Sequence, residues 1–281
     1  AVGFKALLGL TTGSVNTAVG ANSLSAATTA YYCTAIGYSA MGTATTAGLG
    51  TAVGQSAMYN NTTGYANTAV GFSAGYVNQT GSYNVSMGYN ASYQCKGTGN
   101  TGIGCFTLQA ASGSTGNYNT ALGYQALGAL STGSNNVTLG KTAGNTITTG
   151  DNNVCIGYNA NATSATVDNE ITLGNSSIAT LRCQVTSITA LSDRRDKTDI
   201  NTLDLGLDFI NELKPVKFKW QSREGIGKDG TYEAGFIAQD FQQIQKDKDA
   251  EYLNMVLESN PDKLEAAPGK LIPILVRAVQ E

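Results

Sequence analysis

The chain has no histidine, and this absence removes the residue that most often serves in acid–base chemistry and metal binding. Its five cysteines form no Cys-x-x-Cys pair, and an odd number cannot all join in disulfides within one chain. No hydrophobic run has membrane-spanning length, and the first residues have neither the basic flank nor the apolar core of a signal peptide. We therefore expect no metal, no cofactor and no membrane insertion. We interpret the cysteines as small buried residues: Cys33, Cys95, Cys105, Cys155 and Cys183.

Charge is also scarce in the first two thirds of the chain. Residues 1–190 contain seven charged side chains but 28 of the 34 glycines, whereas residues 191–281 contain 13 basic and 17 acidic residues. The net charge of −3 therefore lies almost wholly in the second part, which has neither a basic stripe nor a basic tail. This distribution predicts two unlike domains and argues against a nucleic-acid partner.

A small-large-Gly triplet recurs along the first part of the chain. Eight of its ten spacings are 17 residues, and the other two are 16 and 19. The glycines are Gly3, Gly20, Gly37, Gly54, Gly71, Gly88, Gly104, Gly123, Gly140, Gly157 and Gly174. So strict a period indicates a repeat architecture. Because the series is already running at Gly3, we expect the natural protein to extend before Ala1.

Each repeat carries the pattern of one short strand. A large apolar residue such as Val19 precedes the glycine, and a β-branched residue such as Thr17 stands two places before it, so both point to one face. Asn, Gly, Ser and Thr fill the connections, as turns require. One turn cannot bury its own apolar face, so the turns must stack as a solenoid of roughly 50 Å at a strand spacing of about 4.8 Å. Its core is thin, and we expect several chains to associate side by side.

The Asn-Thr-Ala-Val-Gly pattern at residues 16–20 and 67–71 resembles the head repeats of trimeric autotransporter adhesins and the β-roll segments of phage tail fibres. Repeats in those families are usually a little shorter than 17 residues, so the likeness is in pattern. It covers residues 1–177 and implies a trimeric rod. Aromatic residues after the repeat glycines could stack on sugars, but packing against the neighbouring turn or chain is the favoured interpretation. They are Tyr38, Phe72, Tyr89, Tyr124 and Tyr158.

Beyond the repeat, residues 178–190 form a β-type junction and residues 191–281 a small α+β domain. The expected elements are a helix over 202–213 ended by Pro215, a strand over 216–220 pairing with 232–238, a short helix after Asp240, strands near 255–257 and 263–266, and a final helix. The apolar stripe of that final helix must face its own domain or a sister chain. It consists of Leu271, Ile274, Leu275, Ala278 and Val279.

The heptad at residues 191–197 begins this second domain and pairs a serine with a lysine five residues on. A serine hydroxyl is a weak nucleophile unless a base takes its proton, and a lysine is a base only when neutral. An ordinary lysine has a pKa of about 10.4, so desolvation or nearby cations must lower it by roughly 3 units. Arg194 and Arg195 favour the neutral amine, whereas Asp193 and Asp196 oppose it. The plain alternative is that Ser192 and Asp193 cap a turn and that Lys197 is a solvated charge.

Four motifs in order resemble the C-terminal intramolecular chaperone domain of endosialidase-type phage tail spikes and fibres. They are Ser192-Asp193-x-x-x-Lys197, Leu213-Lys214-Pro215-Val216, Gly235-Phe236-Ile237-Ala238-Gln239-Asp240 and the run from Leu271 to Glu281. The resemblance implies that the domain assembles three chains, drives their folding and then cuts itself off. It implies that Ser192 is the nucleophile, Lys197 its base and Leu191–Ser192 the bond cut. Supporting residues are Asp193, Arg194, Arg195, Gln239 and Asp240. Family members usually continue into a coiled coil.

We therefore predict a mainly β homotrimeric tail fibre or spike in the virion. It acts as a serine peptidase once, on itself, and sheds its chaperone domain in the host cytoplasm after assembly. Its expected partners are other phage tail proteins and a host cell-surface receptor, either a glycan or an outer-surface protein. One alternative is a bacterial trimeric surface adhesin with a permanent, non-cleaving cap. A carbohydrate-cleaving spike would need paired carboxylates, and the rod offers only Asp151, Asp168 and Glu170.

Overall fold

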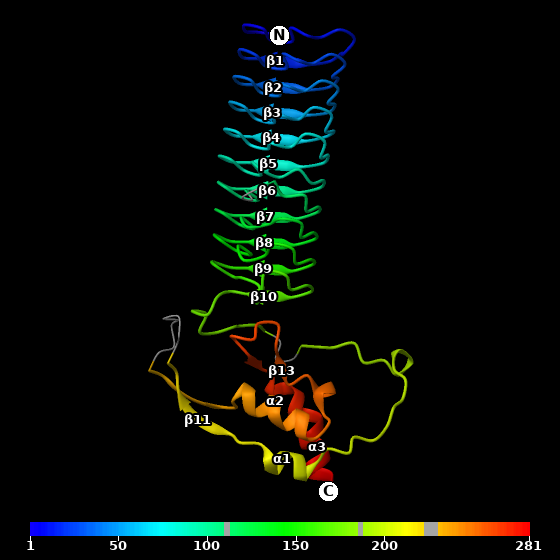
Figure 1. Cartoon of the computed structure of the whole chain (residues 1–281), viewed down its shortest axis with the longest axis vertical. Helices are drawn as coiled ribbons and strands as arrows, with labels where there is room; N and C mark the ends of the chain where they lie inside the picture. Colours follow the sequence, from blue (N-terminus) through cyan, green and yellow to red (C-terminus); the bar gives the residue numbers. More distant parts are fainter. Residues whose placement is uncertain (110–112, 185–187, 222–229) are drawn as a thin grey trace. The chain divides into compact units, whose positions relative to one another are not determined.

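The computed structural model describes residues 1–109, 113–184, 188–221 and 230–281, and it divides the chain into two compact units, Ala1–Asn175 and Ser176–Glu281. The first unit is a solenoid in which each coil adds one strand to a parallel sheet (Figure 1). Its ten strands, which follow one another in sequence order, are β1 (Thr17–Val19), β2 (Thr34–Ile36), β3 (Thr51–Val53), β4 (Thr68–Val70), β5 (Val85–Met87), β6 (Thr101–Ile103), β7 (Thr120–Leu122), β8 (Val137–Leu139), β9 (Val154–Ile156) and β10 (Ile171–Leu173).

The strands pair in a register set by the repeat, so that Thr17 lies beside Thr34 and Val19 beside Ile36. In β1 to β9 the middle residue is buried and its two neighbours point outward. Small residues such as Ala18 therefore fill the interior, whereas the large residue before each glycine lies on the outer face of the sheet. The predicted solenoid of 17-residue coils is confirmed.

The repeat glycines are required by both conformation and space. From Gly3 to Gly157 their φ angles lie between +123° and +136°, a region that disfavours side chains. At Gly88, an added Cβ would stand 2.6 Å from the carbonyl oxygen of Gly104 in the next coil. The coils also turn at non-glycine residues in the left-handed region, among them Leu24 and Tyr32. Stacking thus holds even bulky side chains in a conformation that they rarely adopt.

A ladder of buried asparagines runs along the inside of the solenoid. Each Oδ1 accepts the backbone N–H of the equivalent residue one coil on, and each Nδ2 donates to a carbonyl at the corner of its own coil or the next. The unbroken part consists of Asn67, Asn84, Asn100, Asn119, Asn136 and Asn153, and it ends on the N–H of Glu170. Asn16 makes the same bonds, but Cys33 and Gly50 interrupt the series. Residues that the pattern assigned to turns therefore satisfy buried backbone groups.

The three carboxylates of the rod serve as backbone acceptors as well. Asp151 accepts the N–H of Ser134 at 2.6 Å, and Asp168 accepts the N–H of Asp151 at 2.7 Å. Glu170 accepts from the backbone and hydroxyl of Thr163 and from the hydroxyl of Thr172. Each carboxylate therefore has a structural role in closing the last coils.

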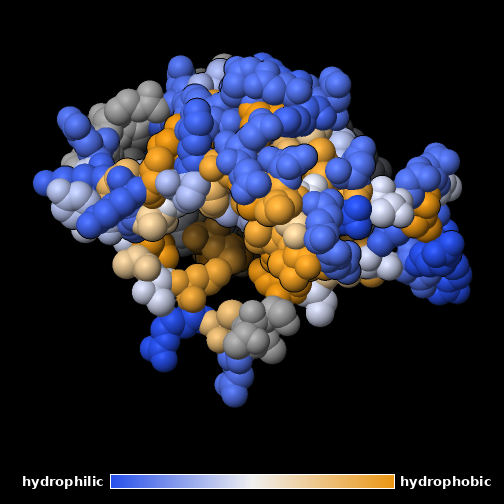
Figure 2. Space-filling model, turned by 90° about the horizontal axis from the view of Figure 1, so that it is seen from below, coloured by the Kyte–Doolittle hydropathy of each residue, from blue (hydrophilic) through white to orange (hydrophobic). Residues whose placement is uncertain are grey.

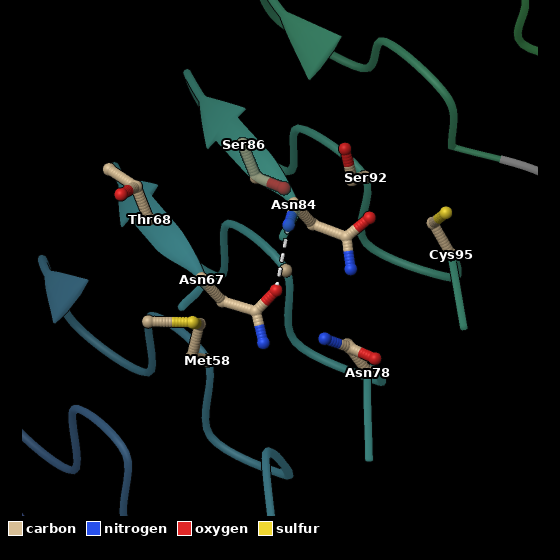
Figure 3. Close-up of a pocket in the computed structure, with 9 residues that line it drawn as sticks. Met58, Asn67, Thr68, Asn78, Asn84, Ser86, Ser92 and Cys95 are labelled. Carbon is tan, nitrogen blue, oxygen red and sulfur yellow. Dashed lines mark hydrogen bonds between the residues drawn. The ribbon is translucent and has the colours of Figure 1, made fainter. Parts of the chain in front are cut away.

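The apolar core of the rod is interrupted by a polar section. One buried cluster ends at Ala74 and a second begins at Leu108. Between them, Gly75 and Ser92 occupy the coil position that Met58 and Leu108 fill elsewhere. Asparagines and serines line a cavity of about 10 Å³ there (Figure 3), and the buried Ser92 Oγ has no hydrogen-bond partner among the described residues.

Aromatic side chains pack between successive coils, as favoured above, at Phe72, Tyr89 and Tyr124. Phe72 and Tyr89 stack with centroids 5.2 Å apart, and Phe106 meets Tyr124 edge-on at 6.0 Å. The Lys141 ammonium lies over the ring of Tyr158. A separate column of three stacked rings joins Tyr59, Tyr76 and Tyr93.

Three of the five cysteines are buried, as predicted: Cys33, Cys95 and Cys155. Burial raises the pKa of both the Cys95 and Cys155 thiols to about 11. Cys105 is only half-buried and Cys183 is exposed, so the prediction is wrong for Cys183.

The second unit is a small α+β arrangement. Its elements are η1 (Arg194–Asp196), α1 (Leu207–Glu212), β11 (Val216–Lys219), β12 (Tyr232–Gly235), α2 (Ala238–Asp247), η2 (Glu251–Leu253), β13 (Val256–Leu257), β14 (Glu265–Ala266), η3 (Pro268–Leu271) and α3 (Ile272–Gln280). Strands β11 and β12 pair antiparallel, as predicted. The two further strands that were expected, β13 and β14, also form an antiparallel pair. Residues 178–184 and 188–190 contain no strand, which corrects the predicted β-type junction; 185–187 lie outside the described residues.

Helix α1 begins five residues later than predicted. The residue before it is Gly206, which has no side chain to cap the helix, and the first N–H is bound instead by Glu281, where Leu207 N donates to Oε2 at 2.8 Å. A partner 74 residues away leaves no local signal in the sequence.

The core of this unit joins α1, α2 and α3 through Phe209, Phe241, Ile244, Leu271 and Ile274. The predicted stripe of the final helix is divided. Leu271 and Ile274 face this core, but Leu275 and Val279 are exposed beside Ile272 and Val276. Hydrophobic residues also gather on the face of the molecule seen in Figure 2.

Candidate functional site

The candidate site lies on an exposed arm. Residues 188–201 are all exposed to solvent, and the short turn η1 is their only regular element. Asp193 caps this turn by accepting the N–H of Arg195 at 2.8 Å, and it also binds the Arg195 guanidinium at 2.6 Å. These bonds to Arg195 lower the pKa of the Asp193 carboxyl.

The turn brings the predicted serine and lysine together. Lys197 Nζ donates to Ser192 Oγ at 2.5 Å and to the Ser192 carbonyl oxygen at 3.4 Å. The contact forms because η1 reverses the chain, with Lys197 N donating to the Arg194 carbonyl at 3.2 Å. Asp193 thus caps the turn, as predicted if the heptad were only a turn. The Ser192 hydroxyl, in contrast, contacts the Lys197 amine.

The peptide bond before Ser192 is open to solvent. The side chain of Leu191 is fully exposed, at 102% of its reference area. A hydroxyl in contact with an amine can pass it a proton when the amine is neutral, and it then becomes a nucleophile beside an accessible carbonyl.

The other predicted supporting residues lie elsewhere. Gln239 and Asp240 are exposed in the first turn of α2, and within the described parts of the chain no hydrogen bond joins them to Ser192 or Lys197. Asp240 instead lines a groove of about 420 Å³ between the end of α1 and helix α2. No pattern in the sequence predicts this groove, although residues from two of the four sequence motifs line it.

Among the described residues, no cluster of three or more His, Cys, Asp or Glu side chains could hold a metal ion. None of the helices in the described residues combines the length and apolar character of a membrane span.

Comparison with protein families gives one match. Residues 192–249 match the model of peptidase family S74, described as the chaperone of endosialidase. The match begins at Ser192, covers about a fifth of the chain and includes every residue of the groove. No curated protein and no solved structure matches the chain significantly.

The second unit therefore carries an endosialidase-type chaperone domain, preceded by a β-solenoid of stacked 17-residue coils. This combination fits a phage tail fibre-like protein, and the family implies autoproteolytic peptidase activity. The resemblance drawn from the four motifs is confirmed in the segment that the family model covers.

Proposed function

We propose that the chain is the distal part of a phage tail fibre or spike, whose chaperone domain assembles three chains and then releases itself at Leu191–Ser192. The observation that carries this proposal is the family match beginning at Ser192, together with the 2.5 Å contact between Lys197 Nζ and Ser192 Oγ. The domain acts once, on its own chain, and turns over no external substrate.

The cleavage balances with one water molecule. Neutral Lys197 takes the proton of the Ser192 hydroxyl, and Oγ attacks the Leu191 carbonyl carbon. The carbon–nitrogen bond breaks, the proton passes from Lys197 to the new Ser192 amine, and an ester joins Leu191 to the serine oxygen. Water then hydrolyses this ester, which leaves a carboxyl group on Leu191 and restores the hydroxyl of Ser192, now the first residue of the released domain. Because Lys197 is exposed in the single chain, we expect assembly to shield its amine from solvent.

The outer face of the rod supports assembly from several chains. Nine of the ten large residues that end strands β1 to β10 are at least 36% exposed, and no charged residue interrupts the strands. Including the residue after each glycine, which adds one charged side chain, Lys141, this strand face is about 50 Å long and 16 Å wide, on the order of 800 Å². A standard interface buries about 800 Å² on each partner. We propose that three strand faces pack around a common axis.

A substitution in the strand face tests assembly. Val70→Lys places a charge at a position 39% exposed in the single chain, so burial against sister chains becomes unfavourable and the protein should remain monomeric. Thr63→Lys, on an exposed corner, is the matched control and should stay trimeric. Light scattering gives the mass of each, and a trimeric Val70→Lys variant would exclude this face as the interface.

Cleavage is tested by denaturing electrophoresis of the assembled chain. The parent should give fragments of 191 and 90 residues, whereas Ser192→Ala and Lys197→Ala should give one intact band. Two variants serve as controls: Thr198→Ala changes the exposed residue next to Lys197, and Lys270→Ala removes another exposed lysine. Both variant chains should be cut normally. A parent that assembles but never cuts favours the alternative, a surface adhesin with a permanent trimerisation cap.

The virion location and the remaining partners belong to the same proposal. The rod joins other tail proteins and meets a host surface receptor, a glycan or an outer-surface protein, while the released domain stays in the host cytoplasm. The stacking of Tyr59, Tyr76 and Tyr93 covers ring faces that a sugar would need. Binding of purified assembled rods to host cells, with and without removal of surface glycans, distinguishes the receptor types.

A further inference from the structure

The groove between α1 and α2 has an apolar floor and an acidic rim. Leu213, Phe236, Phe241 and Ile244 form the floor. The charged side chains of the rim are Glu212, Lys214, Asp240 and Asp247. Glu212 is paired with Lys248, which leaves the carboxylates of Asp240 and Asp247 against the Lys214 ammonium. Its volume of about 420 Å³ lies within the range of pockets that bind ligands, about 300–1,000 Å³. A segment with an apolar side chain followed by positive charge fits this surface.

The arm at the start of the second unit has this character. Leu191 exposes its whole side chain, and Ile188 is 97% exposed. Arg194 and Arg195 follow within four residues and are exposed as well. Leaving a leucine and an isoleucine in water costs free energy that a partner surface would recover.

Charge distinguishes the arm from the rest of its unit. Residues 191–195 of the arm carry two basic residues (Arg194 and Arg195) and one acidic residue (Asp193, which is paired with Arg195), a net charge of +1. Residues 200–281 carry ten basic and fourteen acidic residues, a net charge of −4. Complementary charge of this kind steers association and fixes which segment binds.

We propose that the groove binds residues 191–195 of a neighbouring copy of the chain, with Leu191 on the apolar floor and the two arginines at the acidic rim. The inference rests on the proposed function, because it names the surface that shields the cleavage site on assembly. The arm does not occupy the groove of its own chain, since Leu191 and both arginines are exposed there. In this arrangement each Leu191–Ser192 bond is desolvated by a second subunit, so an unassembled chain keeps its bond in water.

Cross-linking between two kinds of chain tests the proposal without relying on cleavage. Both chains carry Ser192→Ala, which keeps them whole, and Cys183→Ser, which removes the exposed thiol. One also carries Leu191→Cys and the other Gln243→Cys, at the groove. Co-expressed and treated with a short bismaleimide, they should give a covalent pair of chains that neither gives alone. A third chain carrying both cysteines reports linkage within one chain. Linkage confined to a single chain, or none, would overturn the proposal.

Charge reversal tests the assigned contacts. Asp247→Arg in the groove should lower the yield of linked pairs roughly three- to tenfold, and Arg194→Asp in the arm should restore it when both are present. Glu251→Arg, an exposed reversal outside the groove, is the control and should leave the yield unchanged. A yield unaffected by Asp247→Arg would exclude the acidic rim as the binding surface. If linked pairs form while the parent chain never cuts, the groove assignment stands and the proposed peptidase activity fails.

Discussion

Removing one rung of the asparagine ladder should destabilise the rod strongly. Asn119 is fully buried; its Nδ2 donates to the Gly133 carbonyl at 2.9 Å, and its Oδ1 accepts the Asn136 N–H at 3.0 Å. Asn119→Ala leaves these two backbone groups buried without their partner, at about 1–3 kcal/mol each. The expected loss is therefore about 2–6 kcal/mol, which lowers the melting temperature of the rod by roughly 4–24 °C.

Thermal unfolding followed by circular dichroism measures this loss on the Ser192→Ala chain, which stays intact. Asn145→Ala makes the same chemical change on an exposed side chain and should shift stability by less than about 0.5 kcal/mol. Equal effects of the two substitutions would refute the account of the ladder, because they would show that the buried amide bonds contribute no more than an exposed one.

Three further predictions concern the rod. Cys33→Asn should raise stability by about 1 kcal/mol in chemical denaturation, because the new amide can bind the Ala47 carbonyl where the thiol now lies at 3.5 Å; a lower stability would contradict this extension of the ladder. Gly88→Ala should cost at least about 2 kcal/mol, since its φ of +131° and the Gly104 carbonyl leave no place for a methyl group; a melting curve like that of the parent would refute the requirement. Cys95 should resist iodoacetamide at pH 8 while Cys183 reacts, because the Cys95 thiol is buried and has a pKa raised to about 11; equal labelling by mass spectrometry would contradict this.

The rod could be predicted closely because its information repeats. A glycine every 17 residues fixes the corners, and alternation around Ala18 fixes the faces of the strand, so the pattern located all ten strands. The asparagine ladder was missed because asparagine in a connection rich in Asn, Gly, Ser and Thr is typical of a turn. The periodic recurrence of asparagine just before the strands, as at Asn119 and Asn136, was the signal that these side chains are buried inside the solenoid.

The second unit has no repeat, and its long-range contacts were harder to predict. The start of α1 depends on Glu281, which binds its first N–H. Which apolar residues of α3 are buried depends on the side of that helix against which α1 and α2 pack. The contact between Ser192 and Lys197 agrees with the spacing in the heptad because a local turn forms it. The groove was missed because its floor joins Leu213 to Phe241, which a sequence pattern does not place together.

The most direct measurement is mass spectrometry of the chain before and after assembly. We predict that the assembled protein yields a 90-residue fragment whose first residue is Ser192, and that the monomeric Val70→Lys variant yields none. A fragment with another first residue, or monomers that cut at Ser192 as readily as assembled chains, would contradict the claim that assembly shields the bond and activates the serine.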